Sequence, residues 1–322
     1  MGGWLVVSRS SGDEPAERIV VGIGDSGPSH YHAALRLAAQ MSRQHRAELN
    51  LVHGCLPRFA HTANEAAQQD LARGQELLEE AELALKPIVD HGIRIGLAAV
   101  PLTAFDALLN ESQTAGMLIV QRRDPSIFRR ALTADTSHTV AAQAACPVIV
   151  VRQDQSETES KRGIVVGVAP RSGLRALEVG VVEAAARKCP LTAVCVWNLQ
   201  FSPTYGGWID PDDEELTEAT KWADSLLAHA VAGVAKDHPG VELHARSVKG
   251  VIEDGLLQEC ETAELLIVER HREAHIASIG LGTLTRHLID HAPCPVMVTP
   301  HSDAHDHLQP THIAEHKTAA QS

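Results

Sequence analysis

Residues 280–283, Gly-Leu-Gly-Thr, have the residue types of an anion-binding loop. They follow the apolar run 265–268, which is too short for a buried helix and is typical of a buried parallel strand. After the loop, apolar residues recur at helical spacing as far as Ile289. A hydroxyl beside glycine at a helix start could hold an anion on free backbone amides. The alternative is an ordinary helix start that the hydroxyl of Thr283 caps.

The elements around this loop form a βαβ unit. The helix ends before Pro293, because proline lacks an amide hydrogen, and a second β-rich run follows at residues 295–299. The loop therefore lies at the carboxyl end of a strand, where open α/β sheets bind ligands. The same layout occurs earlier, and the dipeptide Cys-Pro begins the last strand in both places, at residues 146 and 294. The chain therefore contains a tandem repeat.

Composition limits the classes of protein that this chain can represent. A length of 322 residues favours two domains of roughly 150 residues each. A net charge of −13 without a clustered basic face excludes a nucleic-acid-binding surface. No run approaches the ~18 apolar residues of a membrane span. The six cysteines form no CxxC pair and the start lacks the features of a signal peptide, so we expect a protein of the reducing cytoplasm without disulfides.

The order of the predicted elements gives an α/β fold with two tandem doubly wound, mostly parallel five-stranded sheets and helices on both faces. We expect the first domain at residues 18–151 and the second at residues 163–300. Residues 152–162 contain no apolar side chain and are predicted to be a linker. A flexible leader at residues 1–17 and a histidine-rich tail at residues 301–322 complete the chain. The tail could bind a transition metal weakly, but a solvated tail is the expected state.

The repeat resembles the universal stress protein family, in the tandem two-domain form common in actinobacteria. The resemblance covers residues 18–151 and 163–300. The resemblance rests on the first strands of the two halves, the two Cys-Pro-Val strands and Leu-Gly-Thr at the start of the last helix. The resemblance implies an adenine-nucleotide alpha-hydrolase-like, Rossmann-like fold. It also implies a stress-response role exerted by binding a nucleotide or a protein partner.

Nucleotide-binding members of that family carry a motif that can be compared with this sequence. An aspartate ends their first strand and contacts adenosine, and Gly-x2-Gly-x9-Gly-Ser/Thr after the fourth strand holds ribose and phosphates. Each glycine allows the backbone to approach a phosphate where a Cβ would collide. In the second domain Gly282 and Thr283 match the last two positions. The two earlier glycine positions hold Glu269 and Arg272, and the aspartate position holds Ala169.

The first domain departs further from the motif. The four loop positions hold Gln121, Asp124, Ala134 and Asp135, and the strand position holds Gly24. A carboxylate about 5 Å from a phosphate charge opposes binding by about 3 kcal/mol at an effective dielectric constant of about 20. A helix amino terminus favours an anion by only about 0.3–1 kcal/mol. We therefore expect the first domain to reject a triphosphate.

In the second domain the balance of charges is closer. Glu269 opposes an anion, whereas His271 and Arg272 could offset it. The alternative interpretation of residues 269–275 is a solvated network of salt bridges rather than an acid–base site. His53, after the second strand, is similarly either a satisfied histidine at the rim of a cleft or a contact to a bound base.

The sequence thus predicts a non-enzymatic stress-response protein that acts by partner or ligand binding, has a degenerate nucleotide site in both domains and requires no cofactor. One alternative is an ATP-binding stress sensor that uses domain 2, with Val168, Gly282, Thr283 and Thr285 as its cofactor-binding residues. The other is a hydrolase or nucleotidyl-transfer enzyme of the same fold group, for which an intact phosphate loop and a placed base are missing. No catalytic or metal-binding residue is assigned, although a weak ATPase activity is not excluded.

The last strand of each domain is predicted to mediate association. Strands 147–151 and 295–299 are apolar, and pairing of their edges would bury surface that otherwise promotes aggregation. We expect an intrachain pseudo-dimer through these two strands, and a homodimer remains open. The other expected partners are an unidentified protein or an adenine nucleotide, with no nucleic acid and no membrane.

Overall fold

A computed structural model describes most of the predicted folded region. The described residues are 18–25, 30–56, 64–90, 92–122, 136–155, 162–169, 172–198, 201–202, 207–208, 213–270 and 281–301. The predicted leader, residues 156–161 of the linker and residues 302–322 of the tail lie outside them. None of the helices in the described part is long and apolar enough to cross a membrane.

The first half of the chain alternates strands and helices. Its strands are β1 (Arg18–Gly22), β2 (Glu48–Leu56), β3 (Ile95–Thr103), β4 (Met117–Arg122) and β5 (Val148–Arg152). Its helices are α1 (His32–His45), α2 (Asn64–Leu85), α3 (Ala104–Ser112) and α4 (Thr136–Gln143), with short 3-10 helices η2 (Lys86–Ile88) and η3 (Gln153–Gln155). The strand order is β3-β2-β1-β4-β5 with parallel neighbours, which is a doubly wound arrangement.

The second half repeats this arrangement. Its parallel strands are β6 (Ile164–Gly167), β7 (Leu191–Trp197), β10 (Leu243–Lys249), β11 (Leu265–Glu269) and β12 (Val296–Thr299). Its helices are α5 (Leu174–Arg187), α6 (Asp213–Ala235), α7 (Ile252–Glu259) and α8 (Thr283–His291). The order β10-β7-β6-β11-β12 matches that of the first half. The predicted α/β fold with mostly parallel strands is therefore confirmed.

The second half also contains a small antiparallel hairpin, β8 (Phe201–Ser202) with β9 (Gly207–Trp208). One detail differs from the sequence prediction. The segment predicted as a linker begins with ordered structure, because Arg152 ends β5 and Gln155 is buried. The carboxamide of Gln155 donates to the carbonyl of Ala292 at 2.8 Å, which attaches this segment to the other half.

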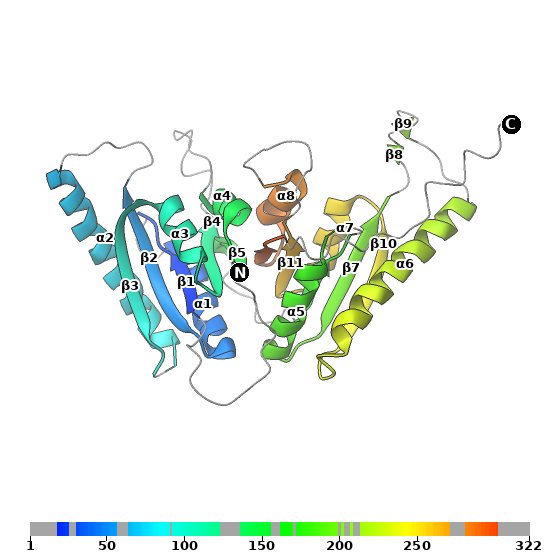
Figure 1. Ribbon diagram of the computed structural model, residues 1–322, viewed down its shortest axis with the longest axis horizontal. Helices are drawn as coiled ribbons and strands as arrows, with labels where there is room; N and C mark the ends of the chain where they lie inside the picture. Colours follow the sequence, from blue (N-terminus) through cyan, green and yellow to red (C-terminus); the bar gives the residue numbers. More distant parts are fainter. Residues whose placement is uncertain are drawn as a thin grey trace.

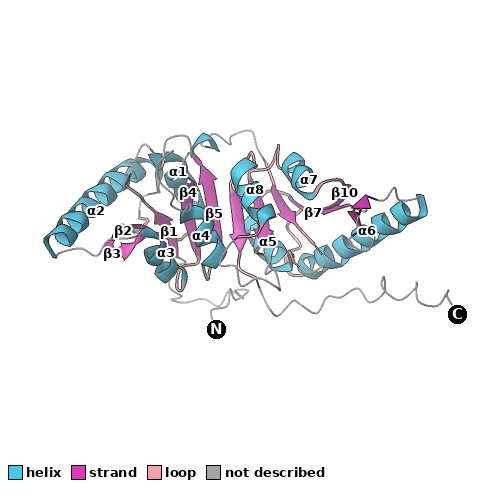
Figure 2. Ribbon diagram, turned by 90° about the horizontal axis from the view of Figure 1, so that it is seen from above, coloured by secondary structure: helices cyan, strands magenta, loops and turns pink. Residues whose placement is uncertain are grey.

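The two halves form one ten-stranded sheet rather than two separate ones (Figure 1). They join through β5 and β12, which pair antiparallel with Ile149 opposite Met297. Both of these side chains are fully buried. The predicted pairing of strands 147–151 and 295–299 is confirmed, since each strand satisfies the edge of the other. Figure 2 shows the strands as a continuous layer with α2 and α6 towards opposite ends.

Each face of the sheet carries one apolar cluster that runs across both halves. One cluster takes buried residues from α1, α2, α5 and α6, and the other takes them from α3, α4, α7 and α8. Helices that correspond in the two halves therefore lie on the same face, and α1 contacts α5 near the seam. The doubly wound halves share their two helical layers as well as their sheet.

A buried ion cluster connects α1 with α5 across the seam. Glu183 is completely buried, and its carboxylate lies 3.1 Å from Nε2 of His45 in the other half. Arg187, one turn later on α5, lies 3.2 Å from the same carboxylate. The Nε of Arg187 also donates to Oε1 of Gln44 at 3.4 Å. Because these charges are removed from water, each depends on its partner.

A second cluster joins the halves on the opposite face. Asp290, at the end of α8, lies 2.9 Å from Nε2 of His138 on α4 and 3.0 Å from Nη2 of Arg122. Nη1 of Arg152 donates to the backbone carbonyl of Asp290 at 2.9 Å. Arg270 donates to the carbonyl of Ala144 at 3.1 Å. Polar contacts on both faces therefore fix the angle between the two halves.

We predict that Glu183→Ala destabilises the protein by about 3–5 kcal/mol, because it leaves the buried guanidinium of Arg187 without its counter-charge. Urea unfolding followed by circular dichroism measures the change. The matched control is Glu178→Ala on the same helix. Glu178 pairs with Arg175 at a partly exposed position, so its loss should cost only about 0.2–1 kcal/mol. Equal, small losses in both variants would contradict a structural role for the ion cluster.

The buried cysteines give a prediction that depends on pH. All six cysteines are free thiols, and burial raises the pKa of Cys146 to about 12 and that of Cys195 to about 11, from an ordinary 9.0. The native thiols therefore stay protonated at pH 8, where the thiolate is the reactive form. We expect iodoacetamide to modify both at least about 100-fold more slowly in the native protein than in urea. Mass spectrometry of timed samples measures the rates, and equal rates would contradict the burial.

The same shift links folding stability to alkaline pH. An unfolded thiol loses its proton near pH 9, whereas Cys146 in the folded protein does so only near pH 12. The unfolded state therefore binds fewer protons between these values, and stability falls as pH rises through that window. Urea midpoints measured between pH 8 and pH 10.5 should decrease, and a Cys146→Ala variant should lose part of this slope.

Candidate functional site

The candidate site of the second half lies where β6 and β11 end and α5 begins. Val168 follows β6; it is buried, and its amide donates to the carbonyl of Val194 at 2.8 Å. Ala169 and Ser172 form a bridge across the turn that leads to Gly173, the N-cap of α5. Gly173 has a φ of +101°, and a Cβ there would lie 2.6 Å from the carbonyl oxygen of Gly167. Only glycine fits this tight entry into the helix.

The carboxylate of Glu269, the last residue of β11, lies against the first backbone amides of this helix. Its Oε2 accepts the amide of Gly173 at 2.7 Å and the amide of Arg175 at 3.2 Å. The first amides of a helix have no acceptor within the helix, and the helix dipole favours an anion beside them. A carboxylate of the protein itself therefore occupies the position that an external anion would take.

The second oxygen of Glu269 is also bound. Nδ1 of His301 lies 2.8 Å from Oε1, and the Glu269 side chain is only 3% exposed. His301 lies just after the end of β12 at Thr299, and its side chain covers the Glu269 carboxylate. With two backbone amides and one imidazole around it, Glu269 is a fully engaged anion rather than a free acid or base.

The prediction of a solvated salt-bridge network at residues 269–275 is wrong for its first two members. Glu269 belongs to a buried strand and is held by α5, and the Arg270 side chain reaches across the seam to a carbonyl of the first half. The remaining residues of that cluster, including His271 and Arg272, lie outside the described residues.

In the first half, a neutral side chain likewise accepts an amide at the start of a helix. Gln121 occupies the second-last position of β4, and its Oε1 accepts the amide of Ala34 in the first turn of α1 at 3.2 Å. Its amide nitrogen donates to the carbonyl of His30, just before the same helix. Gln121 and Glu269 stand where nucleotide-binding members of the compared family have the first glycine of their motif. Their bonds to α1 and α5 had no signal in the sequence, because the partners lie 87 and 96 residues away.

His53 is part of the fold of the first half. It is 4% exposed, its Nδ1 lies 2.9 Å from the carbonyl oxygen of Ile23, and its Nε2 lies 3.8 Å from Oδ1 of the exposed Asp25. These contacts agree with a satisfied histidine beside the end of β1. By strand register, Cys195 holds the corresponding place in the second half, and it is also buried. Asp124, Ala134 and Asp135 of the compared motif lie outside the described residues.

The remaining predicted site residues lie at the start of α8. Gly282 is the N-cap, and a Cβ added there would meet no atom of the described residues within 4 Å. Thr283 is the first helical residue and is exposed, whereas Thr285 is buried. The expected cap by the Thr283 hydroxyl is wrong, because α8 begins at Thr283 itself and has no side-chain cap.

Val168 and the α8 segment contribute to different apolar clusters. The side chain of Val168 belongs to the cluster on the α5 face, whereas Leu281 and Leu288 of the α8 segment belong to the cluster on the opposite face. In the described ranges no group of histidine, cysteine, aspartate and glutamate side chains could hold a metal ion.

Comparison with known proteins agrees with this architecture. The sequence pattern of the Universal stress protein family matches residues 15–152 and again residues 161–300. The chain is 27% identical over 296 residues to a universal stress protein of Mycolicibacterium smegmatis, covering 87% of this chain and 96% of that protein. It is 24% identical over 310 residues to one from Mycobacterium tuberculosis, covering 87% and 94%.

A solved structure shows the same fold at low sequence identity. The crystal structure of a universal stress protein from Archaeoglobus fulgidus matches with a TM-score of 0.65 and 14% identity, over 89% of this chain and 99% of that chain. Both halves thus match one family pattern, and the whole two-domain architecture has a solved counterpart. The chain belongs to the universal stress protein family and carries two copies of its domain in tandem.

Proposed function

We propose that this universal stress protein acts by binding a protein partner or a small ligand, without enzymatic turnover and without a required cofactor. In this proposal its two nucleotide sites are degenerate. The observation that carries the proposal is the carboxylate of Glu269 on the amides of Gly173 and Arg175. With these amides already bound by its own side chain, the protein has no free acceptor position for an external anion at the start of α5.

Electrostatics supports this role for Glu269. A phosphate brought to about 5 Å from the carboxylate would be opposed by about 3 kcal/mol, and it would also have to replace the acceptor of two amides. If the phosphate displaced Glu269, the carboxylate would also lose its charge-assisted hydrogen bond with His301, which is a further cost of binding. In the first half, Gln121 occupies the corresponding place without a charge, so the obstacle there is one of shape and hydrogen bonding.

The alternative of an ATP-binding sensor in the second half has one observation in its favour. Among the described residues, no side chain caps the start of α8 and no atom lies within 4 Å of a Cβ built at Gly282, whereas the start of α5 is filled. An anion could approach these amides without displacing a side chain of the described residues. Because Gly282→Asp would place a carboxylate at this point, the variant identifies any ATP bound there.

We predict that the native protein shows no ATP binding that Gly282→Asp abolishes, up to about 1 mM ATP. Glu269→Gly should gain such binding, strengthened at least about tenfold, because it removes the negative charge and frees the amides at the start of α5. Equilibrium dialysis with labelled ATP measures both, and circular dichroism confirms that the variants remain folded.

Two control variants make this experiment specific. Glu269→Gln removes the charge but keeps an acceptor, as Gln121 does, and should gain less than Glu269→Gly. Gln121→Gly makes the corresponding change in the first half and should gain no binding sensitive to Gly282→Asp. Saturable ATP binding by the native protein that Gly282→Asp eliminates would establish the sensor in its place. Phosphate release under the same conditions would instead indicate a hydrolase.

A further inference from the structure

A cavity lies at the seam between the two halves, on the face that carries α1 and α5. Its volume is about 820 Å³, within the range of about 300–1,000 Å³ that small-molecule sites occupy. The first half contributes one wall from α1, and the second half contributes the wall that continues from the end of α5. The cavity is therefore separate from the start of α5, where Glu269 lies.

The lining of this cavity is strongly cationic. Arg36 and Arg43 come from α1, and Arg162, Arg187 and Lys188 come from the second half. Among the described residues that line the cavity, Glu264 is the only carboxylate. The whole chain has 28 lysine and arginine residues and a net charge of −13, so five cations around one cavity are a local reversal of its overall charge.

Most of these charges are not neutralised by the described part of the protein. Arg36, Arg162 and Lys188 make no ion pair within the described residues, and Arg43 donates to the backbone carbonyl of Ile88. Arg187 alone has a counter-charge, in Glu183. The other four cations are exposed, so solvent screens part of their mutual repulsion, and a bound anion would relieve the rest.

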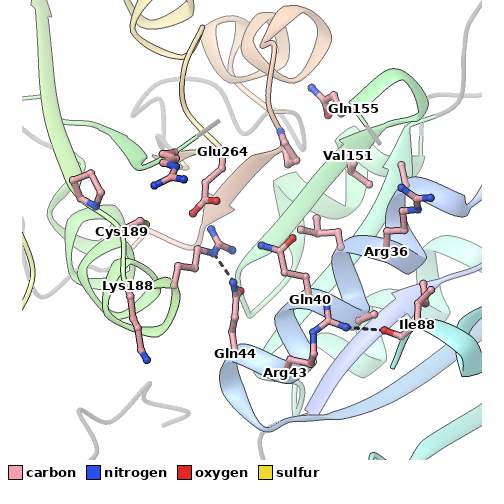
Figure 3. A pocket seen from close by; sticks show the side chains of 17 residues that line it. Arg36, Gln40, Arg43, Gln44, Ile88, Val151, Gln155, Lys188, Cys189 and Glu264 are labelled. Atoms are coloured by element: carbon pink, nitrogen blue, oxygen red, sulfur yellow. Dashed lines mark hydrogen bonds between the residues drawn. The ribbon is translucent and has the colours of Figure 1, made fainter. Parts of the chain in front are cut away.

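The deepest cation is built into the fold. The side chain of Arg187 is 3% exposed, yet it lines the cavity, and Gln44 accepts from its Nε. Figure 3 shows Gln40 and Gln44 directed towards the middle of the cavity from one side and Glu264 from the other. The Nε of Arg187 donates to Gln44 and its Nη2 to Sδ of Met41, so Arg187 fixes this wall of the cavity. The carboxamides of Gln40 and Gln44 offer N–H donors to an anion beside it.

The lining also indicates what is recognised. Among its described residues there is no aromatic ring on which a nucleobase could stack. The carboxamides of Gln40, Gln44 and Gln155 and the guanidinium groups all offer N–H donors. Glu183 already pairs with Arg187, and Glu264 offsets one of the other four cations, which leaves a surplus of positive charge suited to a ligand with several negative charges. The chemistry favours phosphate groups over a base.

We propose that this cavity binds a small polyanion carrying two or more phosphate groups, held between the two halves by Arg36, Arg43, Arg162, Arg187 and Lys188. The ligand contacts both domains at once, so its binding stabilises their association across the seam. The site is independent of Glu269 and of the nucleotide position at α8, and it gives this stress protein a ligand even though Glu269 occupies the helix start.

Inorganic tripolyphosphate is the probe, titrated by calorimetry at low ionic strength. We expect one saturable site per chain, at least about tenfold weaker affinity in the double variant Arg36→Glu/Arg162→Glu, and weakening by added salt. The matched control, Lys221→Glu/Lys236→Glu, makes the same change in net charge at exposed positions in and just after α6, and should change the affinity less than about twofold. Thermal unfolding of all variants verifies their folding.

Further ligands and one variant separate this site from the nucleotide site. ATP should bind about as well as tripolyphosphate, adenosine should not bind, and Gly282→Asp should leave the tripolyphosphate affinity unchanged. The proposal fails if no saturable binding occurs up to about 1 mM, or if both double variants weaken it equally. It also fails if Gly282→Asp abolishes the binding, since the anion would then lie at α8.

Discussion

The first backbone amides of α1 and α5 need hydrogen-bond acceptors. Whether each helix start can bind an external anion depends on whether a side chain of the protein already accepts from these amides. In a nucleotide-binding site of this fold a helix start can receive an anion from solution. Here Gln121 and Glu269, from the ends of corresponding strands, supply the acceptors from within the protein. His301 then closes over Glu269. The amides at the starts of α1 and α5 are thus satisfied by side chains of the same chain.

The antiparallel pairing of β5 with β12 has a further consequence for function. It brings α1 against α5 on one face and α4 towards α8 on the other, so that residues far apart in sequence meet at the seam. The seam creates two features that neither half has alone. One is the buried contact of His45 with Glu183, and the other is the cationic cavity that Arg187 lines. A ligand in that cavity would contact both halves at once.

The sequence was sufficient for the fold and insufficient for the site, for physical reasons. Apolar runs such as residues 265–268, and the repeated Cys-Pro before each last strand, are local patterns that predict strands and duplication. The partner of Glu269 is set by how β11 lies beside the start of α5, which no local pattern encodes. The sequence marks a helix start near Thr283 but not which residue is the N-cap, and the helix begins at Thr283 itself, after Gly282. The ion cluster at Glu183 depends on the seam itself.

A crystal structure grown with a large excess of ATP tests the central claim most directly. We predict that the Glu269 carboxylate remains on the amides of Gly173 and Arg175, with His301 against its other oxygen, and that no phosphate lies at the start of α5. A structure in which Glu269 has turned away and a phosphate of ATP accepts those two amides would contradict it.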